Sequence, residues 1–323
     1  MKIRRGGRGG VVIVGLACLV PFGSQAAWAQ VKLEYKFPEG KKLTYRTTWN
    51  PSQTLTLMGQ EIQSRENKTV VWTQTAAKRR GDSSLPVDVK VESLRTVLRL
   101  QGGIDLTYDS RKPGGQIDDP DFAPLGDLYK LESQVAYTVV LDGQNKVKAI
   151  EGTEALQEKA GKLDPIAREQ IRGRIEAGRI EAQFEQEHRN LPDAPAKPGD
   201  SWERTEIVES GGPPLSLRKK FEYAGTEKRG DKALDKITIK VLEVKCPPQD
   251  PKTPSPLKAT KSDLKVESSE GTILFDREAG CMVESRTRIK IKGTMTFSGG
   301  GTDTSIPVEM TLQSNTQLQA AAK

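Results

Sequence analysis

The stretch Thr153–Leu191, TEALQEKAGKLDPIAREQIRGRIEAGRIEAQFEQEHRNL, decides how the rest of the chain is organised. It is the one long segment whose apolar residues recur at helical spacing. Its first residue suits a helix N-cap, Gly161 interrupts the pattern, and Asp164 followed by Pro165 supplies a second helix start. We therefore predict a helical insert over residues 153–192.

The second part of this insert carries apolar side chains on two sides. At about 100° per residue, Ile166, Ile180 and Phe184 share one face. Ile171 and Ile175 point to the opposite face. A helix with two apolar sides is either sandwiched between two surfaces or broken, and both cases suit an element packed against a sheet.

Short segments with alternating polarity flank the insert on both sides. Such half-buried strands joined by turns indicate antiparallel sheet. The inward positions of the predicted strands include Leu43, Tyr45, Thr47 and Trp49, then Val87, Val89 and Val91, then Ile237, Ile239 and Val241, and finally Val308, Met310 and Leu312. We predict a mainly β (α+β) protein, in which a β half over 30–152 and a β half over 193–323 curve around the central helical insert like a half-barrel.

One fragment of the sequence occurs twice. KRRGD at 78–82 leads into VDVKV at 87–91, and EKRGD at 227–231 leads into ITIKV at 237–241. Each reads as a polar hairpin turn that feeds an alternating strand. Duplication of one β unit and independent convergence on a hairpin both explain this internal repeat.

The chain begins with the features of a secretory signal peptide over residues 1–29. A basic segment precedes the apolar run from Val11 to Val20, and Ala-Trp-Ala follows before a cleavage site between Ala29 and Gln30. Lipid attachment at Cys18 is the rival interpretation. We expect an exported protein, periplasmic or extracellular, and no segment approaches the roughly 20 apolar residues of a transmembrane helix.

Charge does not favour a nucleic-acid partner. Removing the four basic residues of the leader lowers the net charge from +7 to +3, and aromatic residues make up only 5% of the chain. No basic block is interleaved with aromatic residues, as nucleic-acid recognition requires. The apparent basicity belongs mainly to the export signal.

Two cysteines remain after the leader, Cys246 and Cys281. Disulfides persist in exported proteins, so we predict a structural disulfide between them. The two thiols cannot complete a zinc site by themselves, and no cofactor motif stands out.

Two patterns invite a chemical interpretation. Gly199-Asp200-Ser201 resembles a hydrolase block, but the one histidine, His188, precedes the serine and lies on a charged helix. The acidic residues Asp118, Asp119, Asp121 and Asp127 could supply oxygen ligands to calcium, although EF-hand spacing is absent. A turn that enters a strand and a solvated loop are the alternative interpretations.

Four aromatic residues fall on or at the start of predicted strands: Trp49, Trp72, Tyr137 and Trp202. Inward-facing aromatic side chains line an apolar ligand cavity in some proteins and form ordinary core in others. The sequence leaves both possibilities open.

Short motifs relate the chain to a known group of proteins. Tyr35-Lys36-Phe37-Pro38-Glu39-Gly40-Lys41-Lys42-Leu43-Thr44-Tyr45, the Leu141-Asp142-Gly143 hairpin and the Pro-Gly-Asp-Ser-Trp motif at 198–202 resemble an uncharacterised family of secreted bacterial proteins of planctomycete type. The resemblance implies fold and location, and it brings no activity.

The sequence thus favours a non-enzymatic envelope protein. Its most concrete form binds an apolar or lipid-like ligand between sheet and helices, by fold analogy with lipoprotein carriers. A structural or protein-interaction role with a filled core is the alternative, and a serine hydrolase around Ser201 is the more distant one.

Overall fold

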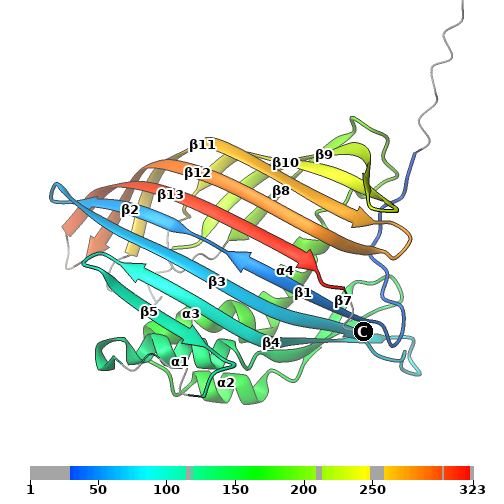
Figure 1. Ribbon diagram of the computed structural model, residues 1–323, viewed down its shortest axis with the longest axis horizontal. Coiled ribbons are helices and arrows are strands. Elements are labelled where there is room, and N and C mark those ends of the chain that lie inside the picture. The colour runs from blue at the N-terminus through cyan, green and yellow to red at the C-terminus, as the bar shows by residue number, and fades with distance from the viewer. Residues whose placement is uncertain are drawn as a thin grey trace, which may run out of the picture.

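The computed structural model describes residues 30–113, 117, 119–208, 213–247, 258–299 and 302–320. These residues form one antiparallel sheet of 13 strands, with a few helices on one of its sides (Figure 1). The mainly β prediction is confirmed, and the two β halves belong to a single sheet.

Chain order and sheet order differ strongly. The sheet order is β7-β6-β4-β3-β1-β13-β12-β11-β10-β9-β8, with β2 beside β13 and β3 and with β5 beside β4. The strands are β1 (Lys42–Trp49), β2 (Ser52–Leu57), β3 (Gln60–Ala76), β4 (Leu85–Leu100), β5 (Ile104–Asp109), β6 (Ala136–Leu141), β7 (Val147–Glu151), β8 (Ser201–Val208), β9 (Leu215–Arg229), β10 (Lys232–Lys245), β11 (Lys258–Asp276), β12 (Cys281–Gly299) and β13 (Thr302–Leu318).

The helical insert is confirmed as a series of short helices, α2 (Glu154–Ala160), α3 (Pro165–Ile175) and α4 (Ala177–His188). Asp164 caps α3, because its carboxylate accepts a hydrogen bond from the Ile166 N–H at 2.8 Å. The break between α3 and α4 falls at Glu176, whose backbone is extended. This break allows Ile171, Ile175, Ile180 and Phe184 all to be buried.

The sequence analysis missed one helix within the first β half. The 3-10 helix η1 (Pro120–Phe122) leads into α1 (Ala123–Glu132). Leu128 and Leu131 of α1 pack with Leu156 of α2 and Ile171 of α3. Helices α1, α2 and α3 therefore share a small apolar cluster of their own.

Period-2 alternation gives the sheet an inner and an outer face. The strand register places Tyr45 opposite Trp72 and, on the other side, opposite Leu318. All three side chains therefore point to the same face, which is the inner one. Figure 1 shows the sheet rolling from β4 and β5 over β1, β13 and β12 to β10, β9 and β8, with the helices on its inner side.

At the end of the sheet that includes the β2–β3 turn, one buried cluster consists of strand residues and Cys246, and we call it the strand core. Leu217, Val241, Ile289, Ile291 and Leu312 are buried together, with no helix residue in their cluster. Its buried residues all come from the second β half, and Trp49 and Leu55 of the first half pack against them. The two β halves therefore meet at this cluster.

Helix α4 lies between the two edge strands β7 and β8. Phe184 packs against Val139 and Leu141 on the inner face of β6. At the other edge, the Gln186 amide accepts a hydrogen bond from the Ile207 N–H (2.9 Å) and donates one to its carbonyl (3.3 Å). This paired contact satisfies backbone groups that an edge strand would otherwise leave free.

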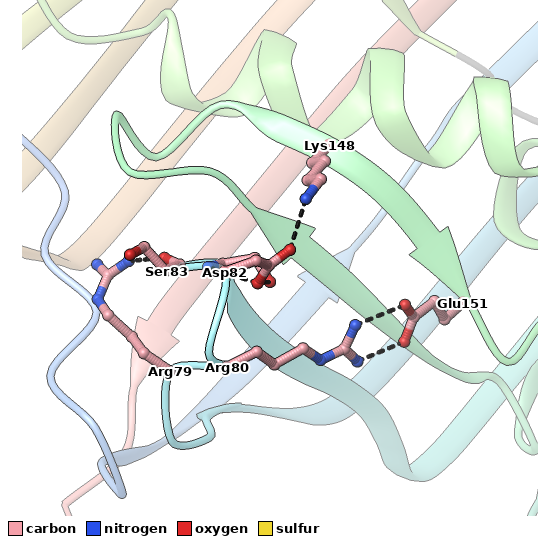
Figure 2. A network of polar contacts seen from close by, with 7 residues as sticks. Arg79, Arg80, Asp82, Ser83, Lys148 and Glu151 are labelled. Atoms are coloured by element: carbon pink, nitrogen blue, oxygen red, sulfur yellow. Dashed lines mark hydrogen bonds and ion pairs between the residues drawn. The ribbon is translucent and has the colours of Figure 1, made fainter.

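Polar side chains fasten β7 to the turn between β3 and β4 (Figure 2). Arg80 makes two hydrogen bonds to the Glu151 carboxylate, at 2.8 and 2.7 Å, and Lys148 pairs with Asp82 at 2.7 Å. About half of each of these side chains is exposed, so the two ion pairs add little to the free energy of unfolding. Their main effect is to hold β7 in position beside the turn.

The two repeated fragments both form β-hairpins, β3–β4 and β9–β10. Tyr223 and Asp235 of the second hairpin are buried, and the tyrosine hydroxyl donates to the aspartate at 2.7 Å. The hairpin interpretation is confirmed, while common descent of the two fragments stays a prediction.

The predicted disulfide between Cys246 and Cys281 is wrong, because both cysteines are free and buried. Asp276 pairs with Cys281, and Phe275 pairs with Asp235 near the start of β10. Cys246 follows the far end of β10, roughly 35 Å from Asp235 at ~3.3 Å per residue. A disulfide needs Cα atoms within about 7 Å of each other.

Candidate functional site

The residues of the hydrolase hypothesis have separate environments. The His188 ring lies in an aromatic cluster, with ring centroids 4.3 Å from Tyr35 and 4.0 Å from Phe184. Its Nδ1 contacts the Phe184 carbonyl at 2.7 Å, and burial lowers its pKa to about 4. Ser201 is an exposed residue at the start of β8, and no hydrogen bond joins it to His188 within the described structure.

The acidic loop has a structural use. The Asp119 carboxylate accepts a hydrogen bond from the Asp121 N–H at 2.9 Å and so caps η1. Asp127 lies on α1, whereas Asp118, Cys18 and Ala29 fall outside the described residues. Where the chain is described, no group of three or more acidic, histidine or cysteine side chains could hold a metal ion.

The four aromatic residues singled out in the sequence all face inward, and each is partly exposed. Trp49 packs on the strand core, Trp202 stacks on Phe221 at 5.8 Å, and Trp72 stacks on Tyr45 at 4.7 Å. Tyr137 lies between two of the buried clusters. These aromatic side chains contribute to the core and stay partly exposed on the inner face.

The hairpin end of the inner face carries a set of aliphatic side chains that we call the aliphatic rim. Pairing of Leu55 with Val308, which is buried in the strand core, fixes its direction as inward. The registers of β2 with β3, β3 with β4, and β4 with β5 extend this face across four strands. The rim consists of Leu55, Leu57, Ile62, Leu98, Leu100 and Ile104.

The aliphatic rim is only partly buried. Ile62 and Ile104 are 40% and 41% exposed, and the other four residues are half-buried. Helix α1 covers the neighbouring inward residues Leu94 and Tyr108, and the clusters that include helix residues contain none of the rim. Leu55 packs against the strand core, whereas the buried clusters of the described residues include none of the other five, which form an apolar stretch of the inner face.

A network of charged groups separates the aliphatic rim from the rest of the interior. Lys68 of β3 forms an ion pair with Glu132 of α1 at 2.6 Å and lies 5.2 Å from the centre of the Tyr129 ring. Arg174 of α3 approaches the same carboxylate at 3.1 Å. Burial alone would raise the pKa of Glu132, but Arg174 and Lys68 outweigh it and hold the pKa below its usual value.

A second charged group lies where α4 meets β8. Glu206 and Lys219 are both more than nine-tenths buried and form a short ion pair. The other oxygen of Glu206, Oε1, is buried without a hydrogen-bond partner among the described residues. Glu187 of α4 lies nearby: burial raises its pKa to about 7, and the Glu206 carboxylate adds to the rise.

The described hollows do not lie over the rim. One is a space of about 10 Å³ beside Phe37 and Leu43, and the other is an open groove of about 430 Å³ among α2, α3 and α4. The groove's charged groups already have partners, since Arg172 binds Glu169 and Glu176. We therefore do not assign it a ligand.

Sequence reasoning did not find the rim or the charged pairs. The rim has the same alternating pattern as the buried strands, and only the missing cover distinguishes it. Glu187 was one of several charges on the insert, and its spacing from Phe184 and Ile180 was the available signal.

The chain belongs to a family of unknown function, DUF6263, whose model matches residues 82–282. The predicted resemblance to an uncharacterised family is thus confirmed at this level. Planctomycete origin and the Pro-Gly-Asp-Ser-Trp motif as a family signature stay predictions. Curated proteins give no match.

Several solved structures are distantly similar to the chain. Lipovitellin, in a structure on lipid-protein interactions, is 9% identical with a TM-score of 0.43, over 89% of this chain but only 26% of its own. A putative exported protein with a YmcC-like fold from Bacteroides fragilis is 10% identical with a TM-score of 0.24, over 90% of this chain and 99% of its own. DynF from Micromonospora chersina is 9% identical with a TM-score of 0.21, over 89% and 86%.

These TM-scores all lie below 0.5, so the likenesses carry no argument about what the chain binds. The chain spans about a quarter of the lipovitellin chain that it matches. Within the described residues, no helix is long and apolar enough to cross a membrane.

Proposed function

We propose that the protein is an exported, non-enzymatic envelope protein that binds an apolar or lipid-like ligand on the inner face of its sheet, at the aliphatic rim. The observation that carries the proposal is the partial exposure of six inward aliphatic side chains on four neighbouring strands. Large apolar side chains that gather in one exposed patch mark binding surfaces more often than isolated ones do.

The shape of the patch supports a chain-like ligand. The rim runs across β2, β3, β4 and β5 on the inner side of a curved sheet, next to the strand core. Covering apolar surface stabilises a complex by about 25 cal/mol per Å² removed from water. A flexible apolar chain can follow such a curved strip and contact all six side chains.

The sequence supports export and a role without catalysis. Residues 1–29 have the charge, apolar run and small-residue site of a signal peptide. The hydrolase alternative needs a base beside Ser201, and His188 is packed in its own aromatic cluster. These observations favour a binding protein of the envelope.

A structural or protein-interaction role is the second candidate, and the strand core favours it. Leu215, Leu217, Ile291 and Val308 are at most 1% exposed, so the centre of that core is filled. In this alternative the rim is the edge of a filled interior, and a partner protein covers it.

The test combines a native mass with mutation. Mature protein is purified from the cells that make it, its native mass is measured, and co-purifying molecules are extracted into organic solvent. We expect a stoichiometric apolar molecule that is lost in the I62N/I104N variant and retained in the control L242N, whose leucine is exposed on β10 outside the rim. A bare wild-type mass, combined with no uptake of a fluorescent fatty acid, would favour the structural role.

A further inference from the structure

Strand β12 carries a series of cations on the outer face of the sheet, which Figure 1 shows turned away from the helices. Ile289 and Ile291 are buried in the strand core, so the residues that alternate with them point outward. These outward residues are exposed cations: Arg286, Arg288, Lys290 and Lys292. Positive charge therefore repeats every ~6.6 Å along this part of the strand.

The strand registers extend this face across the sheet in two rows of paired residues. The first row, from β12 through β13, β2 and β3 to β4, consists of Lys290, Thr311, Ser52, Arg65 and Arg99. The second row, from β12 through β13, β1 and β3 to β4, consists of Arg286, Asn315, Thr48, Thr69 and Arg95. Neighbouring strands lie ~4.8 Å apart, so each row is about 19 Å long. Both rows begin and end with cations, and hydroxyl or amide side chains fill most positions between them.

Further amide groups lie between the two rows. Gln313 of β13 is the strand partner of Arg288, and Asn67 of β3 follows Arg65 on the same face. Both amides are exposed. Val97, the partner of Asn67 on β4, is an apolar exception. This part of the outer face therefore combines cations with neutral hydrogen-bonding groups.

Some of the cations are neutralised by carboxylates of the same face. Arg286 pairs with Glu284 at 2.7 Å, and Lys292 pairs with Glu309 on β13. At the other end of the first row, Arg99 pairs with Asp105 at 3.3 Å. These three cations are therefore less available to an external anion.

Four cations form no ion pair within the part of the chain that the structure describes: Arg65, Arg95, Arg288 and Lys290. Glu270 of β11 lies opposite Arg288, and Asp109 of β5 lies opposite Arg95, but neither carboxylate forms an ion pair with its opposite arginine. Asp109 instead pairs with Arg111 at 3.4 Å. We call the four cations, with the amide and hydroxyl groups between them, the outer basic face.

We propose that the outer basic face binds an extended acidic polysaccharide. The carboxylates of the polymer contact the unpaired cations, and guanidinium groups suit them because they offer paired N–H donors. The sugar hydroxyls exchange hydrogen bonds with the amide and hydroxyl side chains between the cations. An open sheet face about 19 Å wide accommodates several sugar units of an extended chain.

The composition of the face favours a polysaccharide over two other anionic partners. Proteins that lie on a membrane surface insert aromatic or leucine side chains between the lipid headgroups, and the two rows contain neither. Binding of single-stranded nucleic acid uses aromatic side chains on which the bases stack, and the rows contain none of these either. Amide and hydroxyl groups are instead the natural partners of sugar hydroxyls.

The outer basic face is distinct from the aliphatic rim. The rim lies on the inner face of β2, β3 and β4, whereas Ser52, Arg65 and Arg99 point to the outer face of the same strands. A ligand on one face does not contact the other. The polysaccharide proposal therefore does not depend on the apolar ligand.

The test measures binding of a galacturonate octasaccharide to the mature protein by calorimetry at about 50 mM salt. The triple variant R65Q/R288Q/K290Q removes three unpaired cations of the face. The matched control K78Q/K130Q/K146Q removes the same net charge from exposed lysines outside it, in two turns and on α1. A further variant, N67A, removes one amide and keeps every charge. Neutral dextran, phosphatidylglycerol vesicles and an oligothymidylate serve as comparison probes.

We expect the octasaccharide to bind wild type and the control variant equally, and at least about tenfold more weakly to the triple variant. Affinity for wild type falls about tenfold or more when salt is raised to about 300 mM. N67A loses about fivefold.

The comparison probes distinguish the polysaccharide from other occupants. Dextran is expected not to bind, and the vesicles and the oligothymidylate to bind at least about tenfold more weakly than the octasaccharide. Absence of octasaccharide binding, equal loss in the triple and control variants, or unchanged binding to N67A would each overturn the proposal. Equal or tighter binding of the vesicles or the oligothymidylate would overturn the choice of a polysaccharide.

Discussion

Replacing Lys219 by methionine tests the buried ion pair between Lys219 of β9 and Glu206 of β8, next to the contact of β8 with α4. Lys219 and Glu206 are 9% and 6% exposed, so neither charge is solvated by bulk water. Methionine keeps most of the volume of the lysine stem and removes only the ammonium group. The Glu206 carboxylate then loses its partner while its other oxygen is already without one.

The expected loss of unfolding free energy is about 3–5 kcal/mol, because an uncompensated charge stays buried. An exposed ion pair would cost at most about 1 kcal/mol, so the two cases are well separated. Urea unfolding at about pH 8, followed by tryptophan fluorescence, measures the loss.

The double variant K219M/E206L completes the cycle. Removing both charges together is expected to restore the stability to within about 1 kcal/mol of wild type, since apolar replacements of a buried pair are often neutral. A K219M variant that loses less than about 1 kcal/mol would refute burial of the pair. A double variant as unstable as K219M would refute the assignment of the loss to Glu206.

Three further outcomes follow from the buried groups. The folded-state pKa of Glu187, about 7, lies above its ordinary value of 4.5, so wild type loses stability as pH rises from about 4.5 to about 7. In urea unfolding, E187Q is therefore more stable than wild type at about pH 8 but not below about pH 4. The folded-state pKa of His188, about 4, lies below its ordinary value of 6.5, so wild type loses stability as pH falls from about 6.5 to about 4. In thermal melts, the melting temperature of H188F is expected to depend less on pH over this range. Reductant leaves the melting temperature unchanged, and a thiol reagent labels Cys246 and Cys281 fully only in denaturant, whereas an oxidised mass two hydrogens lower would contradict free thiols.

The sequence predicted the local structure better than the arrangement. Alternation around Tyr45 and around Ile239 assigned the inner faces correctly, because period-2 burial is a local property of a strand. The pairing of β1 with β13 joins the two ends of the chain, and no local pattern indicates such a contact. Helix α1 was missed because Pro124 and Gly126 resemble a loop, although Leu128 and Leu131 carry the helical spacing.

The candidate site was harder to predict, for a physical reason in each case. The export signal and the two cysteines left after the leader suggested a disulfide. The strand pairing, which the sequence does not reveal, instead places Cys246 and Cys281 at opposite ends of long strands. In the sequence, Ile62 and Ile104 look like ordinary core residues. Whether a helix covers them depends on tertiary packing, which the local pattern does not show.

The most direct test of the apolar-ligand proposal locates a bound chain on the sheet. A fatty acid with a diazirine on its tail is irradiated with the mature protein, and labelled peptides are mapped by mass spectrometry. We expect labelling within β2–β3 and around Leu98–Ile104, competed by unlabelled fatty acid and abolished in I62N/I104N. Labelling confined to the outer face of the sheet, or no competable labelling, would contradict it.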